Sequence, residues 1–317
     1  MVTAFYKVFN EADFLKESLT NIYPFVDKIV ILEYCLESMR KVILPDRATI
    51  HGLSVDGTTE IIKKFPDPEN KIEHRPIGFI PCAESVPYQM IVDSIDVGDY
   101  AWVIDGDIVY DTDFAEKIKS WIDSDKYDCI WVPEVVFFHD FWHEKHLFFA
   151  HHQRVFKKKS KLSFYYPGCF EVHWLDKDSD KPYRYIRKSE GDPMEYKGKL
   201  LEELTIQRDE GFAFHYALVR NTQRILEKLL WQYEMIDRVW QNEPARNACN
   251  LFRNPLEFKI NTHDWFLAHE PQYLTKWESE HPAVMKGNKW YKYHWDEKPI
   301  NISYAQARKL VNWEGIC

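Results

Sequence analysis

The chain has no CxxC pair, no internal repeat and no apolar run long enough to cross a membrane. Its six cysteines are scattered over 317 residues, which predicts reduced thiols in a cytoplasmic protein and excludes a disulfide framework. A membrane-spanning helix needs about 20 consecutive apolar residues, so we expect no transmembrane segment. The stretch Met1–Lys7 also lacks the plan of a signal peptide.

Long runs of positive charge are missing as well. The formal net charge is −9, and the longest basic run is Lys157–Lys159. Wrapping a nucleic-acid backbone requires many Lys and Arg side chains on one surface, so no nucleic-acid partner is expected, whereas a local basic pocket for a phosphate stays open. Hydrophobic residues make up 45% of the chain, enough for a sizeable core. A chain of this length holds one large α/β domain, or a medium domain with an appendage.

The most informative segment is an apolar run that ends in two aspartates. Tyr100–Ile104 reads as a buried strand, and Asp105, Gly106 and Asp107 follow directly. Parallel sheets bind ligands at the carboxyl ends of their strands. Two carboxylates at that edge, with only a glycine between them, suit Mg²⁺ or Mn²⁺ bound to phosphates. An ordinary Asp-Gly turn is the alternative interpretation.

Strand and helix patterns alternate through the first 136 residues, which predicts a largely parallel βαβ-type sheet. Beyond that point the pattern is irregular and more β-like, and aromatic residues and histidines gather between Trp131 and Trp174. Such a mixed surface suits flat polar ligands such as sugars, although most of these aromatics are expected to pack inside. A long amphipathic helix is expected over Ala217–Trp240.

Six motifs follow one another in a characteristic order: Lys7–Leu15, Val26–Glu33, Ser54–Ile61, Trp102–Asp107, Gln153–Lys157 and Phe214–Tyr216. Together they resemble a family 2-type glycosyltransferase of the GT-A fold, over roughly residues 1–220. The resemblance implies a Rossmann-like mixed α/β sheet flanked by helices. It implies a GT-A domain over 1–216, with a nucleotide-sugar half (about 1–110) and an acceptor half (about 111–216). A helical C-terminal extension over 217–317 would pack on it.

The same resemblance assigns site residues. It implies that Asp105, Asp107 and His215 hold Mn²⁺ or Mg²⁺, with Asp105 also near the ribose. Glu11, Glu33 and Asp56 would contact the nucleoside of a nucleoside diphosphate sugar. The metal would neutralise charge on the departing diphosphate.

The chain departs from the family pattern in two places. Residues 34–53 separate Glu33 from the Ser54 turn, where relatives have almost no insertion. Relatives often carry an Arg-Asn pair before the metal motif, whereas this chain has Glu84–Gln89 without an arginine. The first departure puts the base-binding role of Glu33 in question, and the second removes an expected phosphate contact.

An inverting transferase needs a carboxylate base beside the acceptor hydroxyl. Glu171 is the first candidate, because relatives often place a His-Glu pair in this strand, and Asp140 and Glu134 are the alternatives. The sequence therefore predicts a metal-dependent, inverting glycosyltransferase that acts on a hydroxyl of a glycan or related acceptor. A nucleotidyltransferase and a non-catalytic sugar- or nucleotide-binding protein on a degenerate GT-A core are the competing hypotheses.

Overall fold

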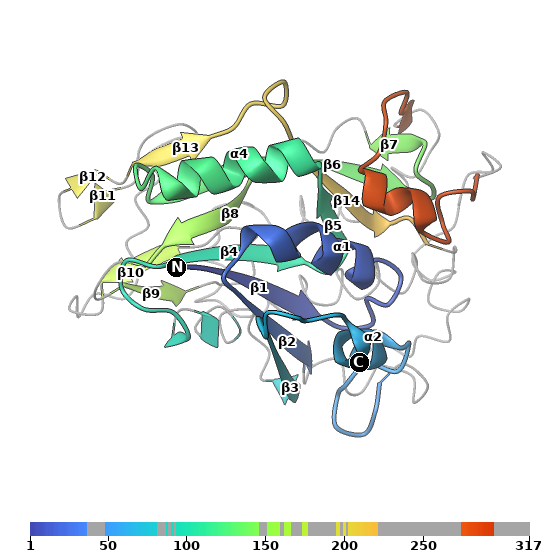
Figure 1. The fold of residues 1–317 in the computed structure, drawn as a ribbon, viewed down its shortest axis with the longest axis horizontal. Helices are drawn as coiled ribbons and strands as arrows, with labels where there is room; N and C mark the ends of the chain where they lie inside the picture. The colour runs from blue at the N-terminus through green and yellow to red at the C-terminus, as the bar shows by residue number, and fades with distance from the viewer. Residues whose placement is uncertain are drawn as a thin grey trace, which may run out of the picture.

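The fold is that of a computed structural model. It describes residues 1–36, 48–80, 87, 90–91, 93–145, 151–158, 162–165, 173–176, 195–196, 199–200, 202–220 and 274–294. These residues form a mixed sheet with helices packed against it (Figure 1).

Eight strands of the main sheet lie in the order β15-β7-β6-β8-β4-β1-β2-β3. Their bounds are β1 (Val2–Val8), β2 (Lys28–Leu36), β3 (Ile72–Ile80), β4 (Tyr100–Asp105), β6 (Cys129–Phe138), β7 (His143–Lys145), β8 (His151–Lys157) and β15 (Leu274–Lys276). Three more strands attach to them: β5 (Ile108–Tyr110), β13 (Glu203–Thr205) and β14 (Ala213–Leu218). Two separate strand pairs are β9 (Leu162–Tyr165) with β10 (His173–Asp176), and β11 (Glu195–Tyr196) with β12 (Lys199–Leu200).

Strand direction decides where side chains can converge. Strand β1 is parallel to β2 and β4, and β2 is parallel to β3. Strand β8 is antiparallel to both β4 and β6, so β4 and β6 point the same way, and β14 is parallel to β6. The carboxyl ends of β1, β2, β4, β6 and β14 therefore lie along one edge of the sheet.

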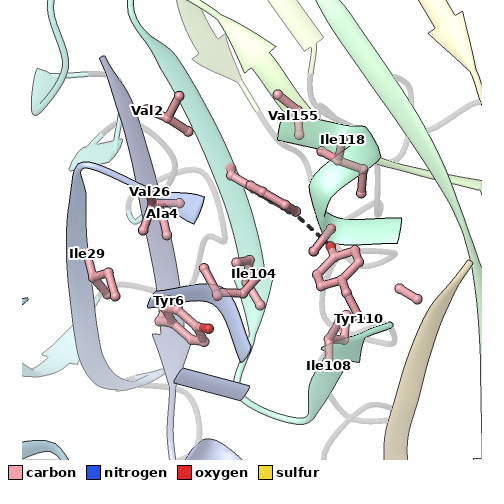
Figure 2. Close-up of a cluster of buried hydrophobic side chains, with 14 of the residues drawn as sticks. Val2, Ala4, Tyr6, Val26, Ile29, Ile104, Ile108, Tyr110, Ile118 and Val155 are labelled. Carbon is pink, nitrogen blue, oxygen red and sulfur yellow. Dashed lines mark hydrogen bonds between the residues drawn. The ribbon is translucent and has the colours of Figure 1, made fainter. Parts of the chain in front are cut away.

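Helices α1 (Leu15–Ile22) and α4 (Thr112–Asp123) lie side by side on one face of the sheet (Figure 1). Alternate residues of β1, namely Val2, Ala4, Tyr6 and Val8, join one buried cluster with the apolar faces of both helices. Figure 2 shows members of this cluster from β1, β2, β4 and β5, together with Ile118 of α4. The indole Nε1 of Trp102 donates to the Tyr110 hydroxyl at 3.2 Å, so this large buried ring leaves no polar atom unsatisfied.

The described residues also include three shorter helical segments. These are η1 (Tyr23–Phe25), α2 (Thr58–Lys64) and η4 (Ala283–Gly287). Helix α2 begins after Gly57, whose φ of 101° is a conformation that glycine adopts without strain. A second buried cluster contains Phe137, Phe141, Tyr216, Trp277 and Met285. It joins residues 274–294 to the sheet, next to β14 in Figure 1.

The predicted fold class is confirmed in its coarse form: the described residues form an α/β mixed sheet flanked by helices. The helix predicted over Ala217–Trp240 is wrong at its start, because Ala217 and Leu218 belong to β14. Its remainder from residue 221, like most of the predicted extension over 217–317, lies outside the described residues. In the portion of the chain that the structure covers, no helix is long and apolar enough to cross a membrane.

Candidate active site

The edge where the parallel strands end gathers charged residues from distant parts of the sequence. Lys7 lies near the end of β1, Asp105 ends β4, and Asp107 follows two residues later. Glu134 lies within β6 and His215 within β14. Since charged side chains are rarely buried without a partner, their pairing shows how this edge is organised.

Gly106 is required by a close approach of the chain. A Cβ atom added there would lie 2.9 Å from Cβ of Glu11 and 3.4 Å from a methyl carbon of Val8. The loop after β1 thus passes directly over the turn that joins the two aspartates. A glycine is therefore needed here to make room for Glu11.

Asp105 is held by two cations. Its Oδ2 accepts a hydrogen bond from Nη1 of Arg154 at 2.9 Å, and Nζ of Lys7 lies 3.6 Å from Oδ1. Burial alone would raise the pKa of Asp105, but Arg154 and Lys7 hold it below its usual range. The Asp105 carboxylate is therefore ionised, and 31% of its side chain is accessible to solvent.

His215 lies between two carboxylates. Its Nε2 is 3.4 Å from Oδ1 of Asp107, and its Nδ1 is 3.1 Å from Oε2 of Glu134. Burial by itself lowers the pKa of His215, yet these two carboxylates raise it to about 9. Glu134 is fully buried and also binds Nε and Nη2 of Arg154, at 2.6 and 2.5 Å. Arg154 outweighs burial and holds the pKa of Glu134 at about 2.

Arg220 completes the arrangement from just beyond β14. Its Nη2 lies 2.5 Å from Oε2 of Glu11 and 3.3 Å from Oδ2 of Asp107, and its Nη1 donates to the carbonyl of Asn10 at 3.2 Å. Only 3% of the Arg220 side chain is exposed. Arg220 thereby ties the loop after β1 to the second aspartate of the motif.

These contacts form one series of alternating charges, which we call the charge chain: Lys7, Asp105, Arg154, Glu134, His215, Asp107, Arg220 and Glu11. Its four carboxylates face the three permanent cations of one lysine and two arginines. Protonated His215 supplies the fourth positive charge, and a metal ion bound at its Nε2 would have to take the place of that proton.

Among the residues described, no group of three or more His, Cys, Asp or Glu could hold a metal ion. The predicted set of Asp105, Asp107 and His215 stays a prediction. Asp105 faces Arg154 and Lys7. Asp107 and His215 face each other, with their nearest side-chain atoms 3.4 Å apart, and Glu134 lies at the other nitrogen of His215.

Two of the three residues predicted to contact the nucleoside, Glu11 and Asp56, lie close to each other. Glu11 binds Arg220, as described, and its backbone N–H donates to Oγ1 of Thr58 at 2.8 Å. The exposed carboxylate of Asp56 accepts from the N–H of Ala12 at 3.0 Å. Glu11 and Asp56 thus both lie where the loop after β1 meets the turn before α2.

Glu33 is fully buried within β2, three residues before the strand ends. Its carboxylate accepts from the N–H of Ser54 at 2.9 Å and the hydroxyl of Thr59 at 2.8 Å, and His74 lies 2.8 Å away. Burial raises its pKa less than these hydrogen bonds lower it, so the group is ionised. Through these hydrogen bonds, Glu33 fixes the turn before α2.

Of the three candidates for the catalytic base, two lie within the described residues. Glu171 lies outside the described residues. Asp140 is fully buried, and its Oδ1 accepts from the N–H of Trp142 and lies 2.8 Å from Nδ1 of His143. Glu134 belongs to the charge chain.

Sequence reasoning gave no role to Lys7, Arg154 or Arg220. Arg154 lies in the buried middle of strand β8, beside Val155 and Phe156, where an unpaired charge would be costly. Arg220 carries no local signal, because its partners Glu11 and Asp107 lie more than 100 positions away along the chain. Only the folded structure brings these residues together.

The sequence matches no family model, and no curated protein matches it. Solved structures similar to the chain include Staphylococcus aureus TarS residues 1–349, with 11% identity, a TM-score of 0.37, and coverage of 86% of this chain and 82% of that one. The same TarS fragment in complex with UDP-GlcNAc has 11% identity, a TM-score of 0.35, and coverage of 84% and 81%. Mannose-6-phosphate isomerase from Helicobacter pylori has 13% identity, a TM-score of 0.27, and coverage of 56% and 61%. These likenesses are low, and the fold described above rests on its own strand order.

Proposed function

We propose that the protein is a glycosyltransferase that moves a sugar from a nucleoside diphosphate sugar to a hydroxyl of a glycan or related acceptor. The observation that supports this is the charge chain at the carboxyl edge of the sheet, centred on Asp105 and Asp107. Ligands bind α/β sheets at this edge. Clustered, strongly perturbed ionisable groups are a feature of functional sites.

Asp107 and His215 are proposed as the ligands of Mn²⁺ or Mg²⁺. When bound, the metal would neutralise the negative charge of the diphosphate as it leaves. Asp105 is proposed to stay with Lys7 and Arg154, facing the ribose side of the donor. Glu134 keeps His215 oriented, and Arg220 keeps Asp107 in place.

Transfer with inversion is proposed in one step. A base takes the proton of the acceptor hydroxyl while the hydroxyl oxygen bonds to the anomeric carbon. The bond between that carbon and the diphosphate oxygen breaks, and the nucleoside diphosphate leaves with its electron pair. Glu171 remains the proposed base, with Asp140 as the alternative. Because Asp140 is buried, it would act through His143.

The test is ligand-induced stabilisation of the purified protein by UDP, GDP, dTDP and CMP, each with and without Mn²⁺. A ligand at 100 times its Kd stabilises a protein by about 2.7 kcal/mol, which raises the Tm by several degrees. We expect one nucleotide to stabilise the protein, and more strongly with Mn²⁺. The variant Asp107→Asn should lose the Mn²⁺-dependent part, whereas Asp96→Asn, at an exposed carboxylate, should retain it.

Each outcome separates the hypotheses. Stabilisation followed by metal-stimulated hydrolysis of the matching nucleotide-sugar supports a transferase. Stabilisation without hydrolysis or transfer favours a non-catalytic binding protein. No stabilisation by any of the four nucleotides contradicts the proposal.

A further inference from the structure

Residues 274–294 return to the main sheet from far along the sequence. Strand β15 pairs antiparallel with β7, and the N–H of Trp277 donates to the carbonyl of Trp142 at 2.8 Å. Met285 is fully buried in the cluster that contains Phe14 and Tyr216. This segment is therefore packed on the edge of the candidate active site.

One contact reaches the strand that carries His215. The buried ring of His281 lies 2.9 Å from the Tyr216 hydroxyl through Nδ1 and 2.6 Å from the carbonyl of Phe141 through Nε2. Tyr216 directly follows His215, and its backbone N–H donates to the carbonyl of Asp107 at 2.9 Å. His281 thus holds Tyr216, the residue that follows one proposed metal ligand and whose backbone is hydrogen-bonded to the other.

A second contact of this segment is with the loop after β1. The buried side chain of Asn288 donates through Nδ2 to the carbonyl of Asp13 at 2.8 Å and to Oε1 of Glu17 at 3.1 Å. Nζ of Lys289 lies 2.5 Å from Oδ1 of Asp13. Two neighbouring residues of the segment therefore fix one aspartate.

Asp13 in turn faces the charge chain. Its Oδ2 lies 4.0 Å from Nη1 of Arg220, the residue that binds Glu11 and Asp107. The ring of Phe14 lies beneath the Arg220 guanidinium, 5.7 Å from its carbon atom. Displacement of Asp13 and Phe14 would therefore disturb the setting of Arg220.

We propose that residues 281–289 form a clamp segment that positions the donor site, with Asn288 and Asp13 as positioning residues. The clamp segment holds the site at Tyr216 on one side and at Asp13 on the other. Its effect on ligand binding rests on the proposed function. Its effect on the loop after β1 does not.

The test compares Asn288→Ala with Lys286→Ala. Lys286 is a matched control because it lies in η4, which Asn288 directly follows, and both partners of its ion pair with Glu280 are exposed. Two quantities are measured for each variant: amide hydrogen exchange in peptides covering residues 10–18 and 216–220, and the Kd of UDP and GDP with Mn²⁺.

We expect Asn288→Ala to increase exchange in these peptides tenfold or more and to weaken nucleotide binding about tenfold. Lys286→Ala should leave both quantities within twofold of the wild type. Unchanged exchange in Asn288→Ala would overturn the clamp segment. If the wild type binds neither nucleotide, the proposed function fails for these donors, while hydrogen exchange still decides the clamp segment.

A milder pair of variants covers the case in which Asn288→Ala does not fold. Lys289 is 66% exposed, so Lys289→Ala and Lys289→Arg should both fold. We expect Lys289→Ala to increase exchange at residues 10–18 two- to fivefold, and to raise the KM for the donor more than it lowers kcat. Lys289→Arg retains a cation beside Asp13 and should behave as the wild type. Equal behaviour of the two variants counts against the proposal.

Discussion

At the scale of single residues, Gly106 couples the two aspartates to the loop after β1. Its backbone has an ordinary φ, so alanine is excluded there by space alone. The atom that an added methyl group would meet is Cβ of Glu11, which can move only if its backbone moves. The site therefore depends on a glycine that carries no chemistry of its own.

We predict that Gly106→Ala displaces Glu11 and weakens its contact with Arg220. Overpacking of this kind costs roughly 1–3 kcal/mol. Urea unfolding should show that loss, and Mn²⁺-dependent nucleotide binding should fall with it. Gly98→Ala is the control for a glycine substitution as such, because an added Cβ there meets nothing within 4 Å, although its positive φ adds strain. Normal nucleotide binding by Gly106→Ala would show that Glu11 adjusts freely.

His281 gives a prediction about pH. Burial lowers its pKa to about 4, and the nearby charges of Asp140 and Glu280 oppose this shift. Nε2 is placed to donate to Phe141, so in the neutral tautomer Nδ1 accepts from the Tyr216 hydroxyl. Burial also raises the pKa of Tyr216, which keeps that hydroxyl protonated.

The unfolded chain takes up a proton at His281 near pH 6.5, whereas the folded chain does so only near pH 4. Its stabilising contribution is therefore complete above pH 6.5 and declines as the pH falls toward 4, by roughly 3 kcal/mol at most. Urea unfolding between pH 7.5 and 4.5 should show this decline. His281→Gln, which does not titrate, should flatten the profile in that range. Equal slopes for both proteins would contradict the prediction.

At the scale of elements, α4 covers the core on the same face of the sheet as α1. Phe114, Ala115, Ile118 and Ile122 are buried with spacings of one, three and four residues, as expected for one face of a helix. Asp111 begins the helix: its side chain accepts from the N–H of Asp113 at 3.0 Å. That bond satisfies one of the four N–H groups that a helix start leaves open.

We predict that Asp111→Ala lowers the free energy of unfolding by about 1 kcal/mol. Asp111→Asn should keep most of the stability, because asparagine caps a helix nearly as well as aspartate. Thermal unfolding measures both, with a shift of roughly 2–4 °C for a loss of this size. An equal loss in Asp111→Asn and Asp111→Ala would show that the charge matters there more than the cap.

At the scale of the whole molecule, the charge chain crosses the sheet from β1 to β14. Its central members, Arg154 and Glu134, come from neighbouring antiparallel strands and are both buried. Breaking a buried ion pair leaves an uncompensated charge and costs about 3–5 kcal/mol. The chain should therefore respond to mutation as a unit.

We predict that Arg154→Met destabilises the protein by about 3–5 kcal/mol. Adding Glu134→Gln to it should recover part of that loss, because the second change removes a buried charge that Arg154 no longer neutralises. Urea unfolding of the two single variants and the double variant gives the coupling energy. Additive effects, with the double variant least stable, would mean that the two residues do not act together.

Much of the first 138 residues could be predicted from the sequence. Local apolar periodicity predicts strands over Val2–Phe9, Tyr100–Ile104 and Asp128–Val136 and a helix over Thr112–Asp123. The structure confirms each of these elements, with β1 ending at Val8 and β6 running from Cys129 to Phe138. The start of the predicted helix at Ala217 was wrong, because parallel pairing with β6 outweighs the local helical pattern.

The sequence by itself determined the mixed α/β class and drew attention to Asp105, Asp107 and His215, since each belongs to a local motif. Only the tertiary structure decided how these residues are used. It paired Asp105 with Arg154 and Lys7, left Asp107 and His215 facing each other, and brought Arg220 to Glu11. Local patterns arise from neighbours in the chain, whereas charge pairing depends on which strand ends meet at one edge of the sheet.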